Sequence, residues 1–152
     1  MRKLTTAALA AVFIAAPVFA GALTLQIDDA QATPEAVAKN AVVVAHITAC
    51  HSPEKTKVTA TAEALVNGKR QTIPLKVMYL SAPGTFAVAR QWPREGAWTV
   101  TMIATNPDYK NYATSVVVPV RNDTAVRADA KVFYHAPSAD EITSVLKPAT
   151  LE

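Results

Sequence analysis

The chain has 152 residues, among them one cysteine, four glycines and ten prolines, and its 15 basic and 12 acidic residues give a formal net charge of +3. A single cysteine excludes an internal disulfide framework and a four-cysteine zinc site. Because 51% of the residues are apolar, the composition is that of a folded chain, and the length suits one domain plus a processing segment.

Residues 1–20 are predicted to be a secretory signal peptide. A positive start at Arg2 and Lys3 precedes an uncharged apolar run, and small residues then place cleavage before Gly21 or, by the same rule, after Ala22. The apolar run is shorter than the ~20 residues that a membrane-spanning helix needs. We therefore expect a periplasmic or secreted protein with no membrane span after cleavage.

Removal of this leader changes the charge of the chain. Arg2 and Lys3 are two of the 15 basic residues, so 13 basic residues then face 12 acidic ones and the net charge falls to +1. The rest of the chain contains neither a run of basic residues nor a basic stripe interleaved with aromatic residues. Nucleic-acid binding is therefore not expected.

The chain after the leader is predicted to be mostly β. Its prolines separate short runs of Val, Thr, Ala and aromatic residues, a pattern typical of a sandwich or barrel. Residues 21–40 are interpreted as an N-terminal extension, with a short edge strand at Leu23, Leu25 and Ile27 and a helical turn or loop at 34–39. The predicted strands follow in chain order at 41–49, 57–66, 69–80, 85–92, 97–105, 112–120 and 126–135.

Local signals refine this prediction. Asn67-Gly68 indicates a type I′ hairpin turn, because both residues tolerate positive φ. Pro74 cannot donate a backbone hydrogen bond, so its strand is expected to lie at an edge or to carry a bulge. Large aromatic residues dominate small cores, and Trp98, Phe86 and Tyr79 are the candidates here.

The C-terminus is predicted to be a short helix. Ser138 and Glu141 have the spacing of a capping box, apolar residues at helical spacing follow, and Pro148 is expected to end the helix. About seven short strands favour an all-β fold, an immunoglobulin-like antiparallel sandwich over residues 41–150 with this helix at its end.

One group of residues suggests metal binding. His46, Cys50, His51 and His135 are candidate ligands, and cysteine with histidine suits copper better than zinc. His46 and Cys50 are four residues apart, about 13 Å in an extended strand, so the chain would have to bend to bring both to one ion. The alternative is a buried thiol beside two surface histidines.

Catalysis finds little support in the sequence. There is no Gly-x-Ser-x-Gly elbow and no glycine-rich phosphate loop. A thiol enzyme would use Cys50 with His51 beside it, but adjacent residues on a strand point to opposite faces. We therefore expect no catalytic residues and no resident cofactor, with copper as the alternative.

Aromatic and basic residues near turns are predicted to bind a partner. Arg90, Trp92 and Arg94 surround the Pro93 turn and could recognise a carboxylate. Tyr109 and Tyr112 lie in another turn region, and loops of this kind commonly carry the function of sandwich domains. The alternative for Trp92 is that it packs across the hairpin onto Trp98 or its neighbours.

Residues 57–105 also resemble a known family. A strand that ends in Trp92-Pro93, a Glu95-Gly96 turn and then Trp98 with alternating aliphatic residues is similar to the small bacterial periplasmic immunoglobulin-like domains of the YtkA and FixH type. The resemblance implies a non-catalytic exported sandwich, in some relatives associated with metal or respiratory-complex handling. Relatives often carry a transmembrane anchor, where this chain has a cleavable-looking signal.

The functional expectation is therefore an exported, non-catalytic periplasmic binding or scaffolding domain whose partner is a protein or a small ligand. Two alternatives stay open at this point. One is a periplasmic copper carrier that uses the histidines and Cys50, and the other is a thiol-dependent enzyme.

Overall fold

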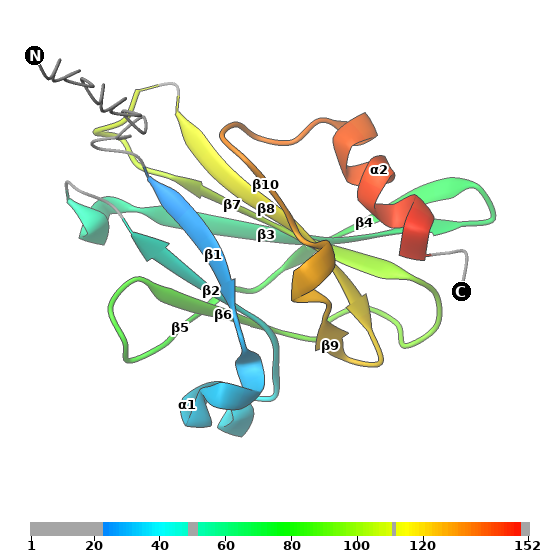
Figure 1. Cartoon of the computed structure of the whole chain (residues 1–152), viewed down its shortest axis with the longest axis horizontal. Helices are drawn as coiled ribbons and strands as arrows, with labels where there is room; N and C mark the ends of the chain where they lie inside the picture. Colours follow the sequence, from blue (N-terminus) through cyan, green and yellow to red (C-terminus); the bar gives the residue numbers. More distant parts are fainter. Residues whose placement is uncertain (1–22, 49–51, 111, 150–152) are drawn as a thin grey trace, which may run out of the picture.

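A computed structural model describes residues 23–48, 52–110 and 112–149 of the chain, so the predicted leader lies outside the described residues. Its strands form two antiparallel sheets that pack against each other (Figure 1). The first sheet contains, in spatial order, β1 (Thr24–Asp28), β2 (Ala41–Thr48), β6 (Thr85–Ala89) and β5 (Met78–Tyr79). The second contains β10 (Lys131–Phe133), β8 (Ala113–Arg121), β7 (Trp98–Thr105), β3 (Lys57–Val66) and β4 (Lys69–Leu75), and β9 (Thr124–Ala125) pairs with β8.

The order of the strands is that of an immunoglobulin domain. Variable-type domains place strands A, B, E and D in one sheet and strands C, F and G, extended by C′, in the other. When the letters are assigned along this chain, β1-β2-β6-β5 reads A-B-E-D and β8-β7-β3-β4 reads G-F-C-C′. β10 adds a strand beyond G. The predicted immunoglobulin-like sandwich is therefore confirmed.

The core lies between the two sheets and is built from alternate residues of each strand. Val43 and Ala45 of β2 face Val100 and Met102 of β7 in one apolar cluster, and all four are fully buried. Trp98 and Phe86 belong to the same cluster, as predicted, with 2% and 4% of their surface exposed.

The sandwich begins earlier than the predicted boundary at residue 41. β1 pairs along its length with β2, and Leu23 and Leu25 are buried in the inter-sheet core. The short helix α1 (Pro34–Ala38) connects β1 to β2 and buries Ala36 against the outer face of this sheet. The alternating leucines predicted this strand from the local sequence. That the strand belongs to the domain follows only from its pairing with β2 and from the burial of the leucines between the two sheets.

The single strand predicted at 69–80 is two strands in different sheets. β4 is an edge strand of the second sheet, where Pro74 was expected to lie, and the chain then crosses to the first sheet as β5. The side-chain amide of Gln91 accepts from the backbone N–H of Lys76 at 2.9 Å and donates to its carbonyl at 3.1 Å, so the crossing residue keeps its hydrogen bonds.

This crossing explains why Tyr79 is not a core residue. It was predicted to be a core aromatic, but it lies on β5, in the other sheet from β4, and 68% of its surface is exposed. Its ring only touches Phe86 edge-on, with centroids 5.1 Å apart.

Two other predicted strands are shorter in the structure. The strand at 85–92 ends at Ala89, so Trp92 lies in the connection that follows β6. The segment 126–135 contains a 3₁₀ turn at Arg127–Asp129 before the short strand β10. The Asn67-Gly68 hairpin is confirmed, because both residues have positive φ between the paired ends of β3 and β4.

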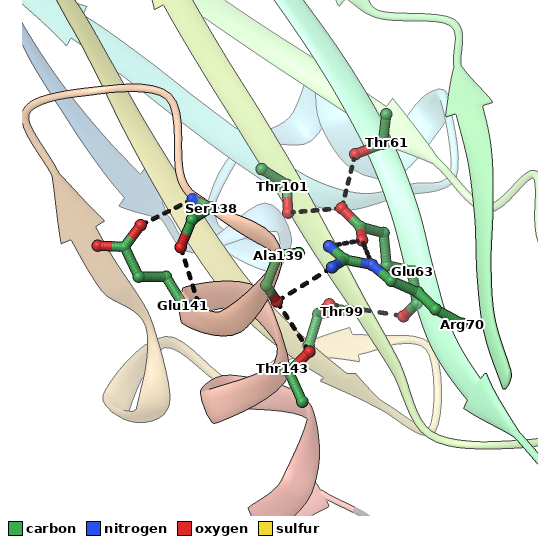
Figure 2. Close-up of polar contacts among 9 residues, drawn as sticks. All are labelled: Thr61, Glu63, Arg70, Thr99, Thr101, Ser138, Ala139, Glu141 and Thr143. Atoms are coloured by element: carbon green, nitrogen blue, oxygen red, sulfur yellow. Dashed lines mark hydrogen bonds and ion pairs between the residues drawn. The ribbon is translucent and has the colours of Figure 1, made fainter. Parts of the chain in front are cut away.

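The C-terminal helix α2 (Ala139–Ala149) begins with the predicted capping box. The backbone N–H of Ser138 donates to the Glu141 carboxylate at 2.7 Å, and the backbone N–H of Glu141 donates to the Ser138 hydroxyl at 3.3 Å (Figure 2). The helix buries Ile142, Val145 and Leu146 against Val117 on the outer face of β8. It continues through Pro148 to Ala149, so this proline lies in the last turn and does not end the helix where predicted.

A buried carboxylate lies between this helix and the second sheet (Figure 2). Glu63 is 3% exposed, pairs with Arg70 and accepts from the hydroxyls of Thr61 and Thr101. Arg70 in turn donates to the carbonyl of Ala139 at 3.0 Å, at the first residue of α2. These bonds offset the cost of burying the charge and hold the start of α2 on the sheet. Within the described residues, no helix is long and apolar enough to cross a membrane.

Candidate functional site

The five residues predicted to bind a partner are divided between opposite ends of the sandwich. Arg90, Trp92 and Arg94 lie where β7 begins and β8 ends, whereas Tyr109 and Tyr112 lie between the end of β7 and the start of β8. β7 has eight residues, so it separates the two ends by about 25 Å. The structure therefore offers two candidate surfaces.

The first surface, called the arginine end, is a pocket of about 650 Å³. Its charged lining consists of Arg90, Arg94, Arg121 and Asp123, and Trp92 and Trp98 contribute to its wall. Arg121 and Asp123 come from β8 and the turn that follows it. Three guanidinium groups and one carboxylate thus share a single open pocket.

The tryptophans give this pocket a rigid apolar wall. Trp92 is 6% exposed and belongs to the same core cluster as Trp98, as the alternative interpretation of this residue predicted. The indole N–H of Trp98 donates to the carbonyl of Glu95 at 2.8 Å. Gly96 supplies the positive φ of +90° that the intervening turn requires.

An ion pair crosses this end of the molecule. The Nη1 atom of Arg90 lies 2.6 Å from Oδ1 of Asp123. Arg90 follows β6 in the first sheet, and Asp123 is in the β8–β9 turn of the second sheet. Asn122 and Asp123 both have positive φ, the mark of a type I′ two-residue turn. The pair therefore ties the two sheets together.

A second pocket adjoins the first. It has a volume of about 500 Å³, is bordered by α1 and the start of β2, and shares Arg90, Arg94 and Asp123 with the first pocket. Arg94 is exposed and, within the described part of the chain, makes no ion pair. Arg121, which lines the first pocket, lies 3.6 Å from Asp129, a residue that lines neither pocket.

The opposite surface, called the tyrosine end, is a more apolar pocket of about 540 Å³. The ring of Tyr112 lies 6.5 Å from those of Tyr109 and Tyr134, at interplanar angles of 47° and 37°. Burial raises the pKa of Tyr112 above its ordinary value, and the neighbouring Tyr134 adds to this effect. Lys57 and Lys110 also line the pocket, so its charged groups are lysines and not arginines.

Buried Asn106 organises the loops at the tyrosine end. Its side-chain amide donates to the carbonyl of Ser52 at 2.9 Å and to the hydroxyl of Thr56 at 3.1 Å. Its oxygen accepts from the backbone N–H of Asp108 at 3.0 Å. Asp108 also forms an ion pair with Lys55 at 3.0 Å. The β2–β3 and β7–β8 connections are thereby joined.

Of the candidate metal ligands, His135 lines the pocket of the tyrosine end, whereas Cys50 and His51 lie outside the described residues. His46 is paired between β1 and β6, with its Nδ1 atom 3.3 Å from the Thr85 hydroxyl. His135 follows β10, and its Nε2 atom lies 3.0 Å from the Glu141 carboxylate. Among the residues that the structure describes, no three His, Cys, Asp or Glu side chains are grouped to hold a metal ion. The metal site stays a prediction.

The sequence interpretation missed the contribution of the β8–β9 hairpin to the arginine end. Arg121 and Asp123 come about 30 residues after Arg90 in the chain. The β8–β9 turn brings them to the pocket that Arg90 lines. The Asn122-Asp123 dipeptide is a signal for this turn, since Asn and Asp tolerate positive φ. The position of the turn beside Arg90 has no local signal.

No protein-family model matches this chain, and no curated protein matches its sequence. The resemblance to periplasmic domains of the YtkA and FixH type therefore stays a prediction, and the functional argument depends on the geometry of the two ends.

Proposed function

We propose that this protein is an exported, non-catalytic binding domain that recognises a carboxylate-bearing ligand at the arginine end. The observation that carries the proposal is the convergence of Arg90, Arg94 and Arg121 on one pocket. A guanidinium group presents planar N–H donors whose spacing matches the two oxygens of a carboxylate.

The pocket also has the size and rigidity of a binding site. Its volume of about 650 Å³ lies within the range of about 300–1,000 Å³ that small-molecule sites occupy. Trp92 and Trp98 are held in the core, so a ligand would meet a wall that is already ordered. Binding to a preformed wall costs little conformational entropy.

The chemistry of the lining suits binding more than catalysis. Arginine stays protonated at all physiological pH values, so it cannot act as a proton acceptor near neutral pH. The charged lining contains only arginines and Asp123, which is engaged by Arg90. The leader pattern at 1–20 supports export, and both cleavage positions precede β1, so cleavage leaves every described strand complete.

The proposal can be tested with succinate as the probe and succinamide as the uncharged probe of the same skeleton. The chain contains two tryptophans, both at the arginine end, so the two indole N–H signals in an ¹⁵N-labelled sample report on this pocket. We expect succinate to shift them and succinamide to leave them unchanged. Because a hydrogen bond to a charged group contributes about 1.5–3 kcal/mol, Arg94→Ala should weaken succinate binding at least about ten-fold.

Lys57→Ala is the matched control, since it removes one cation from the tyrosine end. It should leave the succinate titration unchanged. Equal shifts with succinate and succinamide, or equal weakening by Arg94→Ala and Lys57→Ala, would overturn the proposal.

A further inference from the structure

The carboxylate of Asp123 already occupies part of the arginine end. It lies in the position that a ligand carboxylate would take, against the guanidinium of Arg90, at 2.6 Å. We infer that Asp123 is an internal competitor that the ligand displaces from Arg90, and that the ligand is a dicarboxylate, or an acidic segment with two neighbouring carboxylates, that engages Arg90 and Arg94 together. This inference rests on the proposed function.

The two partners of the ion pair differ in how freely they can move. The Arg90 side chain is 21% exposed and borders both pockets, whereas the Asp123 side chain is 45% exposed and lies at the tip of a two-residue turn. Asp123 can therefore rotate into water without disturbing the core, while Arg90 keeps its place. An exposed ion pair contributes only about 0.2–1 kcal/mol, so a second carboxylate can compete for the arginine.

The position of the pair explains why two carboxylates are needed. Arg90, Arg94 and Asp123 are the charged residues shared by the two adjoining pockets, which makes them the boundary between the pockets. Arg94 is exposed and free of ion pairs within the described residues, so a single carboxylate can meet it without opening the Arg90–Asp123 pair. A second carboxylate on the same ligand forms an ion pair with Arg90, and to do so it displaces Asp123.

Asp123→Asn is a clean test of the competition. Asn accepts the positive φ of +60° at this position, so the turn is kept while the charge is removed. Asp108→Asn is the control, because it makes the same change in net charge and breaks the pair with Lys55 at the tyrosine end without touching an arginine of the pocket. Asp123→Gly, which also tolerates positive φ, is a second variant should the asparagine form fold poorly.

The probes are succinate, with two carboxylates, and acetate, with one, followed by the two indole N–H signals. In the native protein we expect succinate to bind at least about ten-fold more tightly than acetate, and Arg94→Ala to abolish this difference. Asp123→Asn should bind succinate about five-fold more tightly than the native protein, and Asp108→Asn should change the affinity less than two-fold. When Arg90→Gln is already present, adding Asp123→Asn should no longer strengthen succinate binding.

The outcomes separate the inference from the proposed function. If the native protein binds succinate and Arg94→Ala weakens this binding, but Asp123→Asn gives no gain or the same gain as Asp108→Asn, the internal competitor is wrong and the proposed function stands. If acetate and succinate bind equally, the dicarboxylate class is wrong. If neither the native protein nor Asp123→Asn shifts an indole signal with either probe, both fail. Binding that is seen only after Asp123→Asn, and not after Asp108→Asn, supports the competition directly.

Discussion

The arginine end and the tyrosine end are formed by the same strands and differ in how their loops are held. At the arginine end, the indole of Trp98 bonds to a carbonyl three residues away, and the sheets are joined by the half-exposed pair of Arg90 and Asp123. At the tyrosine end, the amide of Asn106 joins two connections that are about 50 residues apart in sequence. One end has a rigid apolar wall with a displaceable ion pair, and the other has loops closed by a buried amide.

This difference indicates which end can exchange its contacts for those of a ligand. An exposed ion pair is worth little and can be replaced by another ion pair of the same chemistry. A buried amide that loses its partners leaves polar groups without hydrogen bonds, which is more costly. The ion pair at the arginine end can therefore be exchanged for another, whereas the loops at the tyrosine end are held in one geometry.

The largest expected effect is at the wall of the arginine end. Trp98→Ala removes a side chain that is 2% exposed from the core and should lower the free energy of unfolding by about 3–5 kcal/mol. Tyr109→Ala, at the half-buried surface of the tyrosine end, should lower it by about 1 kcal/mol or less. Urea denaturation followed by circular dichroism measures both. Equal losses of unfolding free energy in the two variants would show that both ends contribute equally to the core.

A smaller effect is expected for the amide of the tyrosine end. Asn106→Ala leaves the carbonyl of Ser52 and the backbone N–H of Asp108 without their bonds to this side chain, at a cost of about 1–3 kcal/mol. Asn106→Asp is the control of the same shape, which keeps the acceptor and loses the donor. Hydrogen exchange should accelerate in the 52–56 and 106–109 backbone but not at the arginine end. Uniform acceleration would contradict a local role.

A pH effect is expected at the start of α2, close to the tyrosine end. The backbone N–H of Ser138, and then the ring of His135, lower the pKa of Glu141 below its ordinary value of 4.5. A lowered folded-state pKa stabilises the fold above pH 4.5, and this contribution is lost as the pH falls through the folded-state pKa. The difference in melting temperature between the native protein and Glu141→Gln should therefore be present at pH 7 and vanish in acid.

Ser138→Ala is the companion variant for this measurement. It removes the hydroxyl that accepts from the Glu141 backbone, but it keeps the backbone N–H that lowers the pKa of Glu141. It should lower the melting temperature at every pH and leave the pH dependence in place. A pH-independent effect of Glu141→Gln would show that the carboxylate charge contributes nothing to the cap.

The smallest expected effect concerns added metal. The proposed binding domain predicts that one equivalent of Cu(II), or of Cu(I) under reducing conditions, leaves the melting temperature unchanged, and that Cys50→Ala still folds. Tight binding to the folded state would raise the melting temperature. A rise that disappears in both His46→Ala and Cys50→Ala would favour the copper carrier instead. Arg94→Ala, at the other end, controls for non-specific effects.

Local pattern was sufficient for much of the secondary structure. A run rich in Val, Thr and Ala predicted the strand at 57–66 with the bounds that the structure has, Asn67-Gly68 predicted the hairpin, and Ser138 with Glu141 predicted the helix start. Each of these signals acts within about ten residues, so the chain carries it without any help from the rest of the fold. Arg90 and Arg94 were recognised as a pair for the same reason.

The tertiary structure decided which sheet each strand joins and which side chains meet. A period of two tells which residues share a face, but not which sheet that face belongs to, so the crossing at Lys76 and the exposure of Tyr79 could not be read locally. Likewise, Asp123 reaches Arg90 only because the β8–β9 turn folds back against the other sheet. The binding surface depends on such long-range contacts, which no short stretch of sequence specifies.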